Sequence, residues 1–395
     1  MRKRIILAGV LFLIFCMAEL PANAKGEEIA AEEQMFDEYA RFYGGVFEKN
    51  LEEAGAKDFF EFATELDTEE IIKQLNSGKL DISAEQMLKY LLKMLLDEVY
   101  SGARLIAIVL ALSILSSYLG GMKSGFGGES VAKCAFYMCY IIIAGIASTA
   151  FYDIALCVGR AIENIGFFMR VIVPVMITLL MTSGAVISAS TLEPAFLSIV
   201  EIVVWAIETV FIPSVMLSTA LNIVNGISDR FKTDRIVKLL NNSVKWGLTI
   251  MMTIFVSLAG LKSIAASGAD GLTIKLGKFA TANLIPMLGG LLAESVETVM
   301  NCSVVIKNSV GVLGIICLIV LALGPVLKIA AMLILFRITA AVAEPVSEER
   351  IVVCISRLAD SMSVLFSMLS AVVIMFIMTV TIIINSGNTA VILGR

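Results

Sequence analysis

FFMRVIVPVMITLL occupies residues 167–180 and FATANLIPMLGGLL occupies residues 279–292, and each stretch has a proline near its centre. Each is followed by a long apolar block, a short charged stretch containing Arg-Ile-Val, and another apolar block. The charged stretches are TDRIVKLLNNSVKW from Thr233 and EERIVVCISRLADS from Glu348, so the two landmarks recur after 112 and 115 residues. This pattern indicates a duplicated membrane unit, a design in which function arises between the repeats. Few letters are identical, so chance similarity of apolar segments is the alternative.

The composition defines the broad class. The chain has 395 residues, of which 58% are hydrophobic, and its mean hydropathy is +0.90. A soluble core of this size cannot hide so much apolar surface. We therefore expect an all-α polytopic membrane protein in contact with lipids, without a nucleic-acid partner.

Residues 1–24 have the form of a signal peptide. Three basic residues precede a short apolar run over residues 5–17, and Ala22-Asn23-Ala24 supplies the small residues of a cleavage site. We expect cleavage after Ala24, with an uncleaved anchor as the alternative.

The next segment, residues 25–100, is strongly acidic. It holds 8 basic and 19 acidic residues, a net charge of −11, whereas residues 101–395 carry +4. Aromatic residues recur at helical spacing, and Ser83 to Gln86 form a capping box before a leucine-rich helix that leads into the first span. We expect a small exported helical domain on the extracytoplasmic side of the membrane.

Eight apolar blocks follow, with a range of eight to ten crossings. The blocks cover residues 104–119, 134–158, 171–190, 195–227, 244–266, 279–300, 310–342 and 364–384. We assign residues 101–160 to the first two spans, 161–268 to membrane repeat 1, and 269–395 to membrane repeat 2 with the C-terminal tail. Four prolines are candidate helix breaks: Pro174, Pro213, Pro286 and Pro325.

The block over residues 195–227 is longer than one crossing needs. It is followed by a stretch, residues 229–245, with five basic and two acidic residues. Cytoplasmic loops carry such an excess of basic residues. A broken helix or a re-entrant hairpin near Pro213 would return this stretch to the cytoplasm, and we favour that arrangement.

Site chemistry is sparse. The chain has no histidine, which excludes Ser-His-Asp and Cys-His catalysis and histidine-ligated metals. The six cysteines after residue 24 lie in or beside apolar blocks without C-x-x-C spacing. We expect no enzymatic activity, no metal and no cofactor. Since no nucleotide motif is present, a separate ATPase or an ion gradient would supply any energy.

Ionisable residues in apolar blocks are the remaining candidates. They are Glu201, Glu208, Glu294, Glu297 and Lys328. Charges at membrane depth are costly unless they are paired or hydrated. The two readings are a path-lining role and a structural ion pair, such as Glu208 with Lys328.

Several strings together resemble the stage III sporulation protein AE family of endospore-forming bacteria. They are GLTIKLGKFATANLIPMLGGLLAESVETVMNCSVVIKNSVGVLG from Gly271, STALNIVNGISDRFKTDRIVKLLNN from Ser218, EYARFYGGVF from Glu38, and the terminal SGNTAVILGR. The likeness covers essentially the whole chain.

The resemblance implies a membrane component of a channel or secretion-like complex in the mother-cell membrane around the forespore, needed for forespore development after engulfment. Other stage III sporulation membrane proteins are the implied partners. It implies no catalytic residues. From the residues alone, two other roles stay open: a secondary transporter that works independently, and a solid membrane scaffold that recruits partners.

Overall fold

In the computed structural model, the described part of the chain is helical throughout. The structure describes residues 84–121, 129–227, 233–257 and 289–394; the signal peptide, most of the exported domain and Pro286 lie outside these ranges. The named elements are α5 (Ala84–Gly121), α6 (Glu129–Thr182), α7 (Val186–Ala206), the π-helix η2 (Ile207–Phe211), α8 (Ile212–Ile227), α10 (Gly289–Ala343) and α11 (Glu349–Gly394). Residues 234–257 form a further helix. The predicted all-α class is confirmed.

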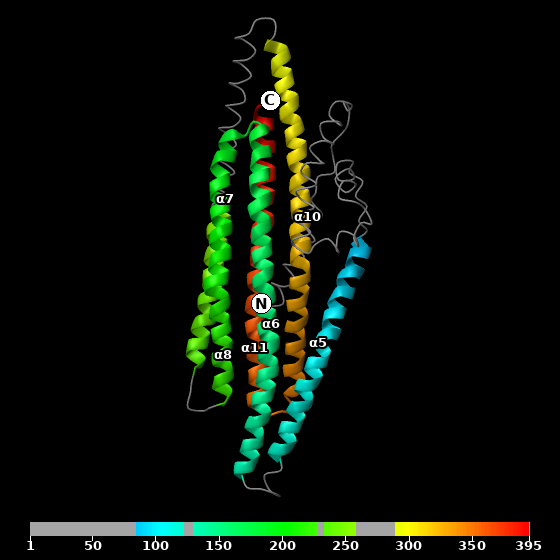
Figure 1. The fold of residues 1–395 in the computed structure, drawn as a ribbon, viewed down its shortest axis with the longest axis vertical. Helices are drawn as coiled ribbons and strands as arrows, with labels where there is room; N and C mark the ends of the chain where they lie inside the picture. The colour runs from blue at the N-terminus through cyan, green and yellow to red at the C-terminus, as the bar shows by residue number, and fades with distance from the viewer. Residues whose placement is uncertain (1–83, 122–128, 228–232, 258–288, 395) are drawn as a thin grey trace. The chain divides into compact units, whose positions relative to one another are not determined.

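The chain divides into two compact units, and the described residues all belong to the second, which comprises residues 50–59 and 82–395. Within this unit α6, α10 and α11 run alongside one another, with α7 and α8 on one flank and α5 on another (Figure 1). The core lies where these helices meet.

Three helices are far longer than a bilayer requires. α6 has 54 residues, α10 has 55 and α11 has 46. At about 1.5 Å per residue each exceeds roughly 65 Å, against a hydrocarbon core of about 30 Å. Within the described ranges, five helices are long and apolar enough to cross a membrane. The number of eight crossings stays a prediction.

Pairs of the predicted apolar blocks lie within single helices. The blocks at 134–158 and 171–190 both fall largely within α6, which runs unbroken to Thr182. The charged residues between them remain helical because they occupy one face: Ile162 and Ile165 are buried, whereas Glu163 is exposed. A charged interval therefore does not require a loop.

The candidate proline breaks behave differently from expectation. Pro174 lies inside α6 and Pro325 inside α10, and both helices continue past them. Neighbouring helices hold such a helix together despite the lost backbone donor. Near Pro213 the chain does not turn back; α7 passes through η2 into α8, and the Ile212 N–H donates to the Ile207 carbonyl. A π-helical turn thus stands in place of the expected broken helix or re-entrant hairpin.

Glycines allow α6, α10 and α11 to approach closely. A Cβ atom at Gly311 of α10 would overlap Ile384 of α11 and lie 2.9 Å from the Met176 Cε of α6. One turn further along α10, a Cβ atom at Gly314 would lie 3.4 Å from Ile172 Cγ1 of α6. We call this three-helix contact the glycine seam. A side chain at Gly311 would force Ile384 to move, whereas a Cβ atom at Gly314 would be in ordinary contact with Ile172.

The two Arg-Ile-Val stretches meet at one end of the bundle. Arg357 of α11, in the second stretch, forms a 2.8 Å ion pair with Asp234 of the first stretch. Asp234 also accepts a 2.8 Å hydrogen bond from Asn225 Nδ2 of α8. Consequently α8 and α10 both run toward this end, and helix 234–257 and α11 both leave it. This direction agrees with a parallel repeat, although the duplication itself stays a prediction.

Because both Arg-Ile-Val stretches lie at the same end of the bundle, we expect them to be on the same side of the membrane. Single cysteines replacing Lys238 and Glu349, both exposed, should react with a membrane-impermeant thiol reagent from the same side. The background protein lacks its native cysteines, and permeabilised membranes control for total reactivity. Labelling from opposite sides would contradict the shared end.

Candidate functional site

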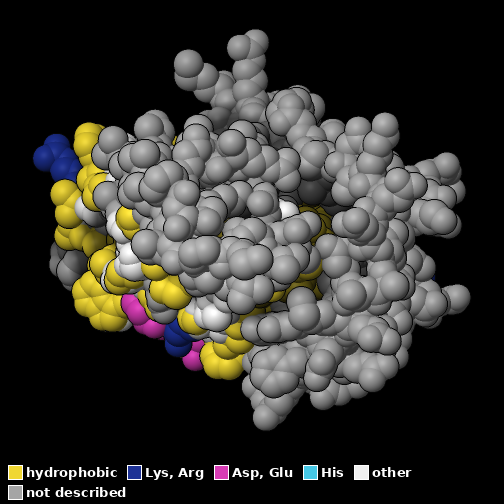
Figure 2. Space-filling view, turned by 90° about the horizontal axis from the view of Figure 1, so that it is seen from above, with side chains coloured by type: hydrophobic (Ala, Val, Ile, Leu, Met, Phe, Trp, Pro, Cys, Tyr) yellow, Lys and Arg dark blue, Asp and Glu magenta, His cyan; other side chains and the backbone are white. Residues whose placement is uncertain are grey.

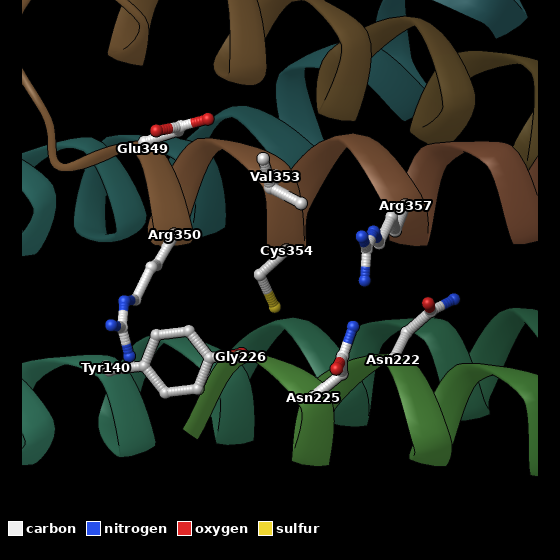
Figure 3. Close-up of a pocket in the computed structure, with 9 residues that line it drawn as sticks. All are labelled: Tyr140, Asn222, Asn225, Gly226, Glu349, Arg350, Val353, Cys354 and Arg357. Carbon is white, nitrogen blue, oxygen red and sulfur yellow. The ribbon is translucent and has the colours of Figure 1, made fainter. Parts of the chain in front are cut away.

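A polar cavity of about 230 Å³ lies among α6, α8 and α11, where the two Arg-Ile-Val stretches meet. The residues that line it are Tyr140, Asn222, Asn225, Gly226, Glu349, Arg350, Val353, Cys354 and Arg357 (Figure 3). Its volume lies below the range of about 300–1,000 Å³ that is typical of sites for drug-sized ligands. The cavity suits a small polar group.

Helical spacing brings these side chains together. On α11, Arg350, Cys354 and Arg357 are separated by four and three residues, so they occupy one face. On α8, Asn222 and Asn225 are three apart and point toward α11 in Figure 3. The cavity is therefore formed by facing stripes of two helices.

Tyr140 of α6 closes one side of the cavity. Its hydroxyl donates a 3.0 Å hydrogen bond to the Ile223 carbonyl of α8. The contact depends on Gly226, because a Cβ atom there would lie 2.6 Å from the Tyr140 Cζ and overlap its hydroxyl. Glycine at this position lets the tyrosine ring lie against the α8 backbone.

Two arginines extend toward the cavity from α11. Arg350 and Arg357 extend from α11, and Asp234 pairs with Arg357. The Glu349 carboxylate points away from the arginines and asparagines in Figure 3. Asn222 is only 4% exposed, and its Oδ1 has no hydrogen-bond partner. The unpartnered Asn222 oxygen leaves hydrogen-bonding capacity inside the cavity.

Catalytic or metal-binding groups are not assembled here. Cys354 lines the cavity as a free thiol, and no histidine exists to activate it. Across the described ranges, no three His, Cys, Asp or Glu residues lie close enough to hold a metal ion.

The predicted acidic candidates lie elsewhere. Glu201 forms a 3.1 Å ion pair with Arg170 of α6, and the two side chains are 59% and 39% exposed. Glu208 lies in η2, and its electrostatic neighbours are Glu163, Arg170 and Glu201. The structure thus joins Glu201 and Glu208 in one charged surface.

Lys328 does not pair with Glu208. It is exposed on α10, near Cys157 and on a different part of the bundle surface. The suggested Glu208–Lys328 ion pair is therefore replaced by the Arg170–Glu201 pair. Helix rotation, which residue spacing alone does not determine, decides which charges meet. Glu294 and Glu297 fall within α10, but their side chains lie outside the described part.

Lys307 is a buried charge that the sequence reasoning missed. It lies in α10, is 0% exposed, and its Nζ donates a 2.7 Å hydrogen bond to the Ile384 carbonyl of α11. It sits one turn from Gly311, at the glycine seam. A single lysine in an apolar run was the available signal, since an ionisable residue inside a membrane helix is a functional candidate by default.

The described residues form an all-helical bundle with five helices that are long and apolar enough to cross a membrane, a small cavity at one end, and no cluster of metal ligands. The family model for stage III sporulation protein AE matches residues 66–387. This chain therefore belongs to the stage III sporulation protein AE family, whose name indicates a role in sporulation.

A relative in Bacillus subtilis (strain 168) carries the name "Stage III sporulation protein AE". It is 28% identical over 312 residues, covering 79% of this chain and 78% of the relative. No solved structure matches the chain.

Lys307 provides a test of the seam. Lys307→Met should leave the thermal unfolding midpoint of the detergent-purified protein unchanged or higher, because an apolar chain of similar length replaces a buried charge. Lys307→Ala should lower it, since truncating a long buried side chain leaves a cavity that costs about 2–5 kcal/mol. A large loss of stability in Lys307→Met would instead show that the hydrogen bond to Ile384 is essential for folding.

Proposed function

We propose that this chain is an integral membrane subunit of a channel or secretion-like complex that links the mother cell and the forespore after engulfment. Membership in a sporulation family and five long apolar helices support this role. The complex lies in the mother-cell membrane around the forespore, and the mature N-terminal domain is on the intermembrane side. Other stage III sporulation membrane proteins are the proposed partners, and a separate ATPase or an ion gradient supplies any energy.

An exposed charged surface on apolar helices carries the proposal. It consists of Glu163 and Arg170 on α6, Glu201 on α7 and Glu208 in η2, and we call it the charged stripe. Figure 2 shows acidic and basic side chains between hydrophobic ones on the described part of one face. Charges directed at lipid cost several kcal/mol. The charged stripe therefore suits contact with a hydrated path or with a partner subunit.

The packed core favours a path outside this subunit over one through it. Met176 of α6, Cys317 of α10 and Phe376 of α11 are all fully buried, and the glycine seam leaves the three helices in close contact. A hydrated path would then run along the charged stripe, between this chain and a neighbour. The same observations favour a scaffold, in which the charged stripe binds a partner without forming a path.

An independent carrier has less support. Carriers bind solutes where membrane helices are unwound near the repeat interface. Here α6 and α10 continue through Pro174 and Pro325. We therefore place a subunit of a larger complex ahead of a carrier that acts alone.

Neutralising the charged stripe tests the proposal. Glu201→Gln and Glu208→Gln should leave the membrane level of the protein near normal, because both side chains are exposed. Spore counts should fall at least about tenfold, since a lost charge-assisted contact costs about 1.5–3 kcal/mol. An immunoblot of membranes and a heat-resistant spore count provide the two readouts.

Glu344→Gln is the matched control, because Glu344 is exposed at the turn before α11 and lies away from the charged stripe. It should sporulate normally. Normal spore counts in both charged-stripe variants would overturn the proposed role of this surface.

A further inference from the structure

The first turn of α11 opens onto the polar cavity. α11 begins at Glu349 and has 46 residues, so its N-terminal end carries the positive pole of a long helix. Arg350 lies in the first turn, and Arg357 lies two turns further on the same face. A helix N-terminus together with guanidinium groups favours an oxyanion.

Asn222 gives independent evidence of a missing partner. Its side chain lines the cavity at 4% exposure, and its Oδ1 has no hydrogen bond. A buried polar atom without a partner is uncommon in proteins and calls for a ligand, ion or water. Since the two ends of a carboxamide are assigned from their hydrogen bonds, Asn222 can equally present its N–H groups to a bound oxygen.

The ion pair at the cavity edge leaves donor groups of Arg357 for a ligand oxygen. Asp234 pairs with Arg357 through one Nη atom at 2.8 Å, and a guanidinium has five donors. Asp234 is also shared with Asn225. The carboxylate of Glu349 points away from the two arginines. The cavity lining therefore includes two arginines and Glu349, and Asp234 pairs with Arg357 at the cavity edge.

We propose that this cavity binds a phosphate group, held by Arg350, Arg357 and Asn222 beside the first turn of α11. Arginine suits this ligand because its planar fork donates two parallel hydrogen bonds to phosphate oxygens. A phosphate can come from an anionic lipid headgroup or from free phosphate. The volume of about 230 Å³ admits either one. This inference is independent of the proposed role in the sporulation complex.

Binding to the full-length protein in detergent tests the proposal. Inorganic phosphate is titrated by calorimetry, and phosphatidylglycerol is added for native mass spectrometry. Arg350→Gln and Arg357→Gln should each weaken binding about tenfold or more, because each removes a charge-assisted hydrogen bond. The thermal unfolding midpoint of each variant is measured in parallel to identify misfolded protein.

Two further variants separate binding from folding. Asp234→Asn breaks the same ion pair as Arg357→Gln but leaves the guanidinium free, so it should maintain or strengthen binding. Arg337→Gln is the matched control: Arg337 pairs with Asp360 at 2.7 Å outside the lining of the cavity. It should bind like the unaltered protein.

The outcomes are decisive. Binding of inorganic phosphate that depends on both arginines identifies free phosphate as a source, and binding of phosphatidylglycerol alone identifies a lipid headgroup. Binding of neither probe overturns the proposal. Equal weakening by Asp234→Asn and Arg357→Gln also overturns it, because the ion pair would then act only in folding. Equal weakening by Arg337→Gln would show non-specific attraction and likewise contradict the site.

Discussion

The close contact of α6, α10 and α11 at the glycine seam is the constraint on which the rest of the structure depends. Gly311 and Gly314 have no side chain, so the three helices pack with little space between them. Small residues at such contacts are a common means of joining membrane helices, because van der Waals packing replaces the hydrophobic effect there. Lys307 lies at this seam and binds the α11 backbone, which adds a polar contact to the packing.

Because the interior is tightly packed, the groups that can contact ligands or partners lie on the surface and at one end of the bundle. The charged stripe lies on the outer surface of α6 and α7, and the polar cavity lies at the end of the bundle between α8 and α11. Both depend on the seam indirectly, since it sets the rotation and height of α6 and α11. A change that displaces α11 should therefore alter the position of Arg357 against Asp234 as well.

The sequence predicts the helical class well, because composition and apolar blocks report it directly. It predicts helix ends poorly. Hydropathy places loops at charged intervals, and prolines suggest helix breaks, but α6 and α10 continue through Pro174 and Pro325. Contacts between distant helices depend on their rotation, which explains why Glu208 does not meet Lys328. The cavity was missed for the same reason, because it forms between helices that are distant in sequence. Lys307 was detectable as a lysine within an apolar run, but its contact with α11 was not.

Disulfide cross-linking across the glycine seam tests this account most directly. Cysteines replace Ile172 and Gly314 in a protein without native cysteines, and a protease site is inserted after Gly184, in the turn that follows α6. After oxidation and cleavage in membranes, the two fragments should remain linked until a reductant is added. The control pair uses Gly145 with Gly314, because a Cβ atom at Gly145 has no neighbour within 4 Å, and it should not cross-link. Fragments that separate with the first pair, or link equally with both, would contradict the seam.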